Sequence, residues 1–332
     1  MAKRRKGKPI HGWVNLNKPK DIGSTQALAI VRRGLNAQKA GHGGTLDPLA
    51  DGILPIALGE ATKTVNYAQD ASKTYEFTVT WGQQRSTDDA EGEVIATSDI
   101  IPTEEQIQAI LPHFIGEIEQ VPPQFSAIKV NGERAYDIAR DGEKVELKSR
   151  KVQVYDLKLC HPEQSEGSHN AEGDPSTTPQ DDKNTTTFIC DCGKGTYIRS
   201  LGRDIALKLS TVGYISSLTR TRVGPFTIDD AISLDYFREI GDKTPETHVV
   251  LPLESVLDDI PVLPLRENEA SRITNGNAIS FIARPDMERL KEIGILPGDI
   301  HTALATFKGT PLAIIEVDGP DIRVLRGLNI NS

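Results

Sequence analysis

The chain has 332 residues, enough for two domains, and its 37% hydrophobic and 26% charged residues predict a globular protein with a sizeable core. It contains no run of about 18 apolar residues, and its basic N-terminus lacks the apolar stretch of a signal peptide. Its composition therefore argues against a membrane protein and against an exported one. The net charge of −9 argues against a generally basic, nucleic-acid-binding surface.

The first elements alternate between extended and helical patterns. Residues 13–16 are typical of a short strand that ends at Lys18-Pro19. Ser24 is the expected N-cap of a helix, because Leu28, Val31 and Leu35 then recur at three- and four-residue steps. A glycine-rich loop follows, and the apolar residues 53–58 after it are expected to be buried.

Alternation is clearest between residues 75 and 81, where Tyr75, Phe77, Val79 and Trp81 would share one face of a strand. A polar, aspartate-rich loop comes next. Thr103 and Gln106 then have the spacing of a capping box at the start of a helix.

The middle of the chain combines turns with a long polar segment. Asn131-Gly132 and Asp141-Gly142 predict turns between short strands, with a helical piece at residues 134–140. Residues 161–183 carry a net charge of −5 and almost no aliphatic side chains, so they cannot bury enough surface to offset the entropy of ordering. They are expected to be a disordered insertion within a hairpin of residues 151–159 and 186–192.

Residues 193–224 carry a net charge of +5, which predicts a local basic face suited to phosphates. Within them Ile198, Leu201, Ile205 and Leu209 would share one helical face. Prolines cluster near residues 251–264, and the short strand patterns after them predict a small β-rich C-terminal domain.

The three cysteines are odd in number and poorly spaced for a disulfide framework, which predicts a cytoplasmic location. Cys190 and Cys192 would share one face of a strand. Core packing is favoured for them over metal binding, because no Cys/His cluster accompanies them.

The stretch GHGGTLDPLADGILPIALGEATK, which contains Asp47, is the main candidate for a functional site. An Asp before Pro commonly caps a turn. Here Pro48 restrains Asp47 to an extended conformation, the glycines permit close approach by a ligand, and aliphatic flanks provide a dry environment. A glycosidase is not indicated, because no second carboxylate has a suitable spacing, and Walker A, Rossmann, zinc-protease and serine-hydrolase motifs are missing from the sequence.

This stretch resembles the signature loop of the bacterial tRNA pseudouridine synthases of the TruB type, which modify uridine 55 in the T loop. It departs from the usual family pattern at Gly43, where Thr is common, and at Ile53. Further blocks that resemble the family follow in the expected order: LNKPKDIGST, KTYEFTVTWGQQRSTDDAEGEV, VPPQFSAIKVNGERAYDIARDG and CGKGTYIRSLGRDIA.

The resemblance implies roles for individual residues in an isomerisation of uridine that needs no metal and no cofactor. Asp47 would be the catalytic nucleophile, and Arg199 would pair with it and keep it ionised. His42 would fill the space that the flipped uridine leaves. The remaining implied uracil-site residues are Tyr75, which would stack on the base, Leu218, which would pack near it, and Lys18, which would lie near the active site. Candidate phosphate contacts are Lys20, Lys129, Arg134, Arg150 and Arg220.

The fold implied is α/β (α+β), with a central, mostly antiparallel mixed sheet and a catalytic cleft across it. Residues 1–252 would form the catalytic domain, with an RNA-clasping insertion at residues 123–151, and residues 253–332 a small domain that resembles a PUA-like RNA-binding domain. The expected partner is the T-stem-loop of tRNA, bound by a monomer. Two alternatives stay open: a tRNA-binding or tRNA-folding module without catalysis, and a relative of the guide-RNA-dependent synthases that act on ribosomal RNA.

Overall fold

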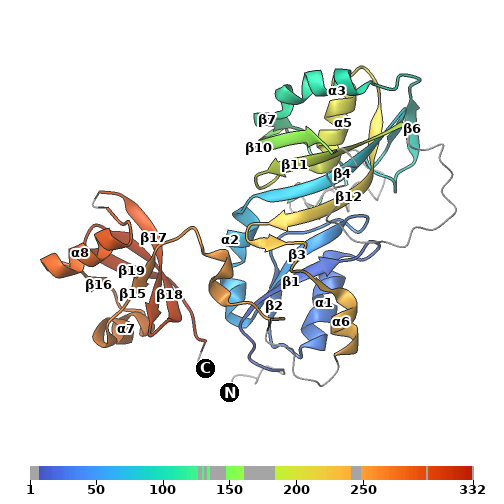
Figure 1. The fold of residues 1–332 in the computed structure, drawn as a ribbon. Helices are drawn as coiled ribbons and strands as arrows, with labels where there is room; N and C mark the ends of the chain where they lie inside the picture. Colours follow the sequence, from blue (N-terminus) through green and yellow to red (C-terminus); the bar gives the residue numbers. More distant parts are fainter. Residues whose placement is uncertain are drawn as a thin grey trace.

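The computed structural model describes residues 7–125, 129–130, 133–134, 147–160, 184–240, 248–296 and 298–330 (Figure 1). Its larger sheet contains β1 (Gly12–Lys18), β2 (Ala40–His42), β3 (Asp51–Leu58), β4 (Lys73–Trp81), β7 (Gly116–Gln120), β10 (Arg150–Leu159), β11 (Thr185–Cys192), β12 (Gly213–Val223), β13 (Phe226–Thr227) and β14 (Ile232–Ser233). Two short hairpins are formed by β5 (Gln83–Arg85) with β6 (Val94–Thr97), and by β8 (Lys129–Val130) with β9 (Glu133–Arg134). The helices beside these strands are α1 (Ser24–Gly34), α2 (Val65–Asp70), α3 (Glu104–Ile110), α5 (Ile198–Lys208) and α6 (Leu234–Glu239), with 3-10 turns η1 (Gly59–Lys63), η2 (Leu111–Phe114) and η5 (Leu253–Val256).

The larger sheet has the strand order β14-β1-β3-β12-β4-β11-β10-β7, with β2 and β13 at its sides. β1 runs parallel to β14 and β3 runs parallel to β12, while the other pairs within the sheet are antiparallel. This confirms the predicted mostly antiparallel mixed sheet.

The centre of the sheet shows why these strands form. Alternate residues of β4 are buried, from Lys73 to Trp81, as the sequence alternation predicted. Phe77 stacks on Phe188 of the neighbouring β11, with ring centroids 5.1 Å apart. Cys190 and Cys192 are also buried on β11, which confirms their place in the core. Helix α5 packs on β4 and β12 and covers this part of the sheet.

Helix starts differ in one place from the prediction. The Thr103–Gln106 capping box is present at the start of α3. Ser24, in contrast, is the first residue of α1 and not its N-cap, which is Gly23. The Ser24 hydroxyl is engaged elsewhere: it donates to the Leu46 carbonyl at 2.7 Å and accepts from the Leu46 N–H at 2.8 Å. Because the Ser24 hydroxyl bonds to the Leu46 backbone, it does not cap the helix.

The predicted hairpin around the polar segment is confirmed, because β10 and β11 pair in antiparallel fashion with Leu159 opposite Phe188. The polar segment itself, residues 161–183, lies outside the described residues, as do the predicted helical piece after Arg134 and most of the predicted RNA-clasping insertion.

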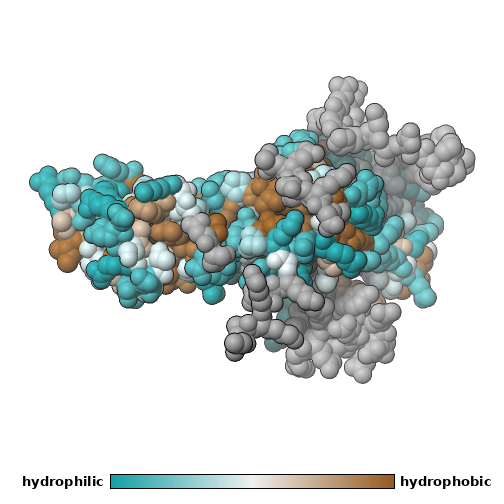
Figure 2. All heavy atoms as spheres, turned by 90° about the horizontal axis from the view of Figure 1, so that it is seen from below, coloured by the Kyte–Doolittle hydropathy of each residue, from teal (hydrophilic) through white to brown (hydrophobic). Residues whose placement is uncertain are grey.

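A second sheet lies toward the C-terminus, with the order β15-β17-β18-β19-β16. Its elements are β15 (Val262–Pro264), α7 (Glu267–Thr274), β16 (Ile279–Ser280), α8 (Arg284–Glu292), β17 (Ile300–Phe307), β18 (Thr310–Asp318) and β19 (Asp321–Gly327). Ala303, Ile315 and Val317 are among the residues of its own apolar core. This β-rich part extends to one side of the larger sheet, and in the space-filling view hydrophilic residues cover most of its visible face, with apolar patches between them (Figures 1 and 2).

The two parts share a contact of apolar side chains and hydrogen bonds. Trp13 of β1 belongs to one buried cluster with Leu304 and Leu328, and its indole Nε1 donates to the Leu253 carbonyl at 3.1 Å. Lys63 Nζ donates to the Gly327 carbonyl at 2.7 Å. In the described parts of the chain, no helix is long and apolar enough to cross a membrane.

Candidate active site

Asp47 lies in the loop between β2 and β3, and the backbone of this loop is held by side chains on three sides. Ser24 holds Leu46, as described above. Arg220 of β12 donates from Nη2 to the Gly44 carbonyl at 3.0 Å and from Nη1 to the Thr45 carbonyl at 3.3 Å. Lys18, at the end of β1, donates to the Pro48 carbonyl at 3.4 Å. The loop that carries Asp47 is therefore positioned by tertiary bonds on either side of the carboxylate.

The Asp47 carboxylate faces a pocket of about 720 Å³. Asp47 itself is 35% exposed there, whereas Leu46, Ile53 and Leu54 around it are buried. The pocket is also lined by Tyr75, Arg199 and Leu218, three residues that are distant in sequence. A carboxylate with one open side and apolar neighbours is suited to reaction with a bound molecule, because water does not fully solvate it.

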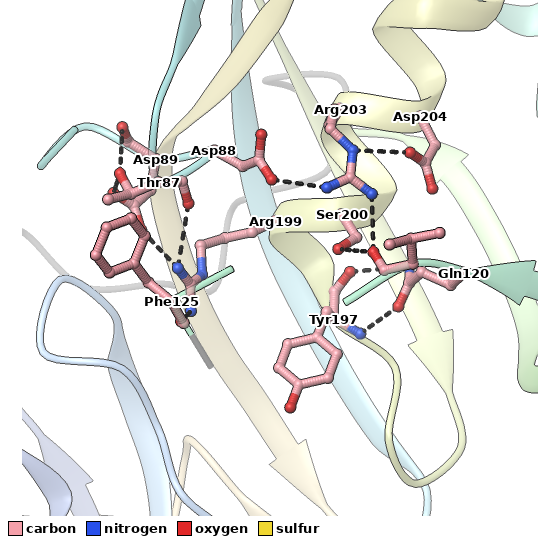
Figure 3. Close-up of polar contacts among 11 residues, drawn as sticks. Thr87, Asp88, Asp89, Gln120, Phe125, Tyr197, Arg199, Ser200, Arg203 and Asp204 are labelled. Carbon is pink, nitrogen blue, oxygen red and sulfur yellow. Dashed lines mark hydrogen bonds and ion pairs between the residues drawn. The ribbon is translucent and has the colours of Figure 1, made fainter. Parts of the chain in front are cut away.

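Arg199 joins two carboxylates at this pocket, and Figure 3 shows its contacts with one of them, Asp89, and with Thr87 and Phe125. Its Nη2 lies 2.9 Å from Asp47 Oδ2, and its Nη1 lies 3.2 Å from Asp89 Oδ2. The guanidinium also donates to the carbonyls of Thr87, at 3.1 Å, and Phe125, at 2.8 Å. Arg199 is only 5% exposed. These partners fix the plane of the guanidinium, so it presents one nitrogen to Asp47 in a set direction.

Tyr75 and Leu218 form an apolar wall of the same pocket. Leu218 lies on β12 opposite Phe77 of β4, and Tyr75 lies two residues before Phe77. Both side chains are less than a tenth exposed. Burial raises the pKa of the Tyr75 phenol above 10, so the group is protonated at neutral pH. The wall thus offers an aromatic face and a hydroxyl, which suits a planar polar ring such as a nucleobase.

Comparison with known proteins supplies the family. A family model described as TruB family pseudouridylate synthase (N terminal domain) matches residues 32–198, and one described as tRNA pseudouridylate synthase B C-terminal domain matches residues 199–258. The chain belongs to the TruB family of pseudouridylate synthases.

Relatives along nearly the whole chain agree with this assignment. The synthase is 48% identical to tRNA pseudouridine synthase B of Caulobacter vibrioides, over 90% of each chain. It is 44% identical to the protein of the same name from Rhodospirillum rubrum, over 99% of this chain and 100% of that one. Its fold is similar to a solved structure of an H/ACA RNP bound to a substrate RNA containing 2′-deoxyuridine, with a TM-score of 0.67 and 22% identity over 99% of this chain and 92% of that one. It is also similar to a Cbf5-Nop10-Gar1 complex, with a TM-score of 0.65 and 24% identity over 96% and 84%.

Two predicted site residues of the synthase, Lys18 and His42, are not among the residues that line the pocket. Lys18 is fully buried and donates to the carbonyls of Pro19 and Ile22 as well as Pro48. Burial lowers its pKa to about 8. His42, on β2, is paired with Ile56 of β3, and its Nδ1 is buried without a hydrogen-bond partner. Burial lowers the pKa of its imidazole, which is therefore neutral at pH 7.

Arg220 differs from its prediction. A phosphate contact requires a guanidinium at the surface, but Arg220 is 2% exposed, and its third hydrogen bond, from Nε to the Ile53 carbonyl, is 2.7 Å long. Its guanidinium donates hydrogen bonds to the backbone of the loop that carries Asp47. Arg220 therefore holds this loop, and its buried guanidinium is not placed to contact a phosphate.

The other predicted phosphate contacts differ in their surroundings. Lys20 lies 4.0 Å from Asp51 and is half exposed. The guanidinium of Arg150 lies over the Tyr197 ring, 5.2 Å from its centroid. The side chains of Lys129 and Arg134 lie outside the described residues. Both Lys20 and Arg150 remain candidates for RNA binding.

The basic face expected from residues 193–224 is not present in the form predicted. Most of its cations are consumed by internal partners: Arg199 by Asp47 and Asp89, Arg203 by Asp88 and Asp204, Arg222 by Asp191, and Lys194 by Asp70. The positive charge of this segment serves to orient the pocket and its surroundings. A sum of charges along residues 193–224 does not reveal such pairing, because all of these acids except Asp204 lie outside the segment.

Asp89 and Thr87 are site residues that the sequence reasoning missed. Asp89 is 1% exposed, and its carboxylate also accepts from the Glu91 N–H and the Thr87 hydroxyl. The sequence signal for both residues is the polar, aspartate-rich loop that follows β5. Among the described residues, no group of three or more His, Cys, Asp or Glu has an arrangement that could hold a metal ion.

Proposed function

We propose that the protein converts uridine 55 in the T loop of tRNA to pseudouridine, with Asp47 as the catalytic nucleophile. The observation that carries the proposal is the Asp47–Arg199 ion pair at the pocket of about 720 Å³. The names of the relatives, tRNA pseudouridine synthase B, support tRNA as the substrate. The choice of the T-loop uridine rests on the resemblance of the Asp47 loop.

The reaction is an isomerisation, so atoms balance without a co-reactant. The bond between uracil N1 and the ribose breaks, the uracil turns, and a bond forms between its C5 and the same ribose carbon. N1 gains a proton and C5 loses one. An Asp47 oxygen is free to add covalently to the nucleoside and leave again, because its other oxygen is held by Arg199. Addition at uracil C6, addition at the sugar and a glycal route all remain compatible with this arrangement.

The surrounding residues assist in separate ways. Arg199 orients Asp47, because its Nη2 holds one carboxylate oxygen at 2.9 Å. Tyr75 and Leu218 enclose the base, and the protonated Tyr75 hydroxyl can donate a hydrogen bond to it. The uridine must leave its stack to reach them, which costs a few kcal/mol. His42 is the proposed occupant of the space left in the RNA.

Replacement of Asp47 by Asn tests the proposal. The amide is nearly isosteric, so the pocket should keep its shape, but it cannot act as a carboxylate nucleophile. Pseudouridine formation on an unmodified T-stem-loop transcript should fall below detection in single-turnover reactions with excess enzyme, which isolate the chemical step. Binding of the transcript should stay within about threefold, because phosphates and shape supply most of the affinity. Near-normal single-turnover formation by the variant would contradict the mechanism.

The same pair of measurements separates the alternatives. A tRNA-binding module without catalysis would bind the transcript and form no pseudouridine even with the unsubstituted chain. A guide-dependent enzyme would require an added guide RNA. The curated relatives, 42–48% identical, favour the guide-independent tRNA enzyme, whereas the H/ACA structures, 22–24% identical, indicate only the fold.

We further propose the predicted domain division, with residues 1–252 catalytic and residues 253–332 a PUA-like RNA-binding domain. The separate five-stranded sheet with its own apolar core supports it. The matched C-terminal family model, residues 199–258, ends near the proposed boundary. The monomeric state and the cytoplasmic location remain predictions.

A further inference from the structure

Helix α5 delivers Arg199 to the pocket, yet its own N-terminus has no side-chain cap. Its N-cap residue is Tyr197, whose side chain makes no capping hydrogen bond. Arg199 is the second residue of the helix. The backbone position of Tyr197 therefore sets where the guanidinium of Arg199 can reach.

Gln120, the last residue of β7, fixes that position (Figure 3). Its side-chain Oε1 accepts from the Tyr197 N–H at 2.7 Å, and its Nε2 donates to the Tyr197 carbonyl at 3.0 Å. The same carbonyl accepts the first hydrogen bond of the helix, from the Leu201 N–H. Gln120 is 1% exposed. A single planar amide thus holds both backbone groups of the N-cap residue in a buried site.

The residues after Gln120 follow the first turns of α5. The Val121 carbonyl accepts from the Ser200 hydroxyl and from Arg203 Nη2, each at 2.8 Å. The Phe125 carbonyl accepts from Arg199 Nη2 at 2.8 Å, and this nitrogen is the one that pairs with Asp47. Gln120 stands at the head of this segment, so it sets the register between the segment and the helix.

We propose that Gln120 is a positioning residue for the isomerisation, one that acts through Tyr197 and Arg199 to place the Asp47 carboxylate. This inference rests on the proposed function of Asp47. A displacement of a reacting group by about 1 Å can cost about a hundredfold in rate, and the two amide bonds act together with the Val121 and Phe125 carbonyls to prevent such a displacement at the start of α5. Gln120 does not line the pocket, and because it is 1% exposed it has almost no surface with which to contact RNA.

Two variants of Gln120 separate the parts of this role. Gln120→Leu removes both hydrogen bonds. Gln120→Glu keeps the length of the side chain and an acceptor for the Tyr197 N–H but loses the donor to the Tyr197 carbonyl. We expect Gln120→Leu to slow single-turnover pseudouridine formation at saturating T-stem-loop by about tenfold to a hundredfold, with a dissociation constant within about threefold of the unsubstituted enzyme. Gln120→Glu should have an intermediate rate and serves as the second variant where the leucine form does not fold.

A matched control distinguishes positioning from general destabilisation. Thr211, just past the other end of α5, is 4% exposed, and its hydroxyl donates to the Ile100 carbonyl at 2.6 Å. Thr211→Val removes this buried bond without touching the pocket. It should lower the melting temperature and leave the rate per folded enzyme unchanged. A loss of rate in Thr211→Val equal to that of the Gln120 variants would overturn the inference.

A double-mutant cycle with Arg199→Lys tests whether Gln120 acts through Arg199. If it does, Gln120→Leu should cost less than about threefold in the Arg199→Lys background, because residues that act as a unit are not additive. Additive losses, or an unchanged rate in both Gln120 variants, would overturn the inference while the Asp47 mechanism stands. If the unsubstituted enzyme forms no pseudouridine, the proposed function fails, and this inference fails with it.

Discussion

At the scale of single residues, the site depends on arginines whose charge is directed inward. Arg199 reaches two carboxylates and two backbone carbonyls at once, which only a planar guanidinium with several donors can do. Arg220 does the same for three carbonyls. Neither arrangement follows from local sequence. Asp89 is 110 positions from Arg199 in the sequence, and Asp47 is 152 positions from it. Nothing in an acidic loop considered alone indicates which basic residue will pair with it.

Arg199→Lys should therefore cause a large loss of activity, although the positive charge is retained. A lysine ammonium cannot span Asp47, Asp89 and the Phe125 carbonyl, so single-turnover pseudouridine formation should fall by about a hundredfold. The affinity for tRNA and its salt dependence should barely change, because Arg199 is buried. Binding measured across a series of salt concentrations is the check. A salt slope lower by about one unit would identify Arg199 as a phosphate contact instead.

Lys18 predicts a pH dependence of stability. Its pKa is 10.5 in an unfolded chain and about 8 here, lowered by burial, although Asp51, Asp47 and Asp21 oppose the shift and Arg220 adds to it. Between these two pKa values the unfolded chain binds more protons than the folded one, so the free energy of unfolding rises with pH. The free energy of unfolding of the unsubstituted enzyme, measured relative to that of Lys18→Met, should rise by about 1 kcal/mol per pH unit between about pH 8 and about pH 10.

Urea unfolding of both proteins at several pH values measures this difference, and other titrating groups cancel in the comparison. If the difference in free energy of unfolding between the two proteins does not change with pH, or decreases as pH rises, Lys18 does not have a lowered pKa in the folded protein.

At the scale of elements, two of the glycines near Asp47 pack against the protein itself, whereas Gly44 lines the pocket, where the sequence predicted close approach by a ligand. Gly52 has φ +98°, and a Cβ there would lie 2.3 Å from the backbone oxygen of Arg220 on the parallel strand β12. A Cβ at Gly43 would lie 2.8 Å from the Ala68 Cβ. Gly52 therefore allows β3 and β12 to approach closely, and Gly43 allows the loop to pack on α2.

Gly52→Ala should consequently destabilise the fold by about 2–4 kcal/mol, from strained backbone and a clash with backbone that cannot move aside. Gly276 is the matched control: its φ is +77°, but a Cβ there would meet nothing within 4 Å. Gly276→Ala should lose only the strain, about 1 kcal/mol. Thermal or urea unfolding of the pair gives the comparison, and equal losses would show that the clash with Arg220 is unimportant.

The elements themselves were the part of the fold most open to prediction. The alternation at residues 75–81 and the capping box at Thr103 depend on neighbours in sequence, and both were found as expected. The prediction that Ser24 caps the helix was wrong, because its hydroxyl makes two hydrogen bonds with the backbone of Leu46, 22 residues away in sequence. The candidate site was predicted at Asp47, Tyr75, Arg199 and Leu218 through the family resemblance, whereas Asp89 and Gln120 required coordinates.

At the scale of the whole molecule, the net charge of −9 is unevenly distributed along the chain. Residues 161–183 hold −5 of that charge. The strands that flank them, β10 and β11, remain paired up to Leu159 and Phe188, and the Cys160 N–H donates to the Thr187 carbonyl at 2.9 Å. The sheet therefore holds the two ends of the segment in register.

Replacement of residues 161–183 by a short glycine-rich turn should preserve the fold and the turnover. Affinity for tRNA should rise slightly at low salt, because the net charge falls from −9 to −4, and this gain should vanish at high salt as long-range repulsion is screened. Circular dichroism, single-turnover kinetics and binding at two salt concentrations check these outcomes. A tenfold loss of turnover would mean that the segment takes part in function.

Strand β1 has a contact of consequence at each end. Trp13 meets the C-terminal part through Leu253 and the shared apolar cluster, and Lys18 holds the Pro48 carbonyl beside Asp47. Four residues separate these anchors, which are about 17 Å apart along the extended chain, and β3 and β14 pair with the strand on its two sides. Unpairing β1 would break the Trp13 contact with the C-terminal part and the Lys18 bond to the catalytic loop in the same event. The backbone amides of β1 should then exchange with solvent deuterium through one common opening, at a rate that is slow and shared from Trp13 to Lys18.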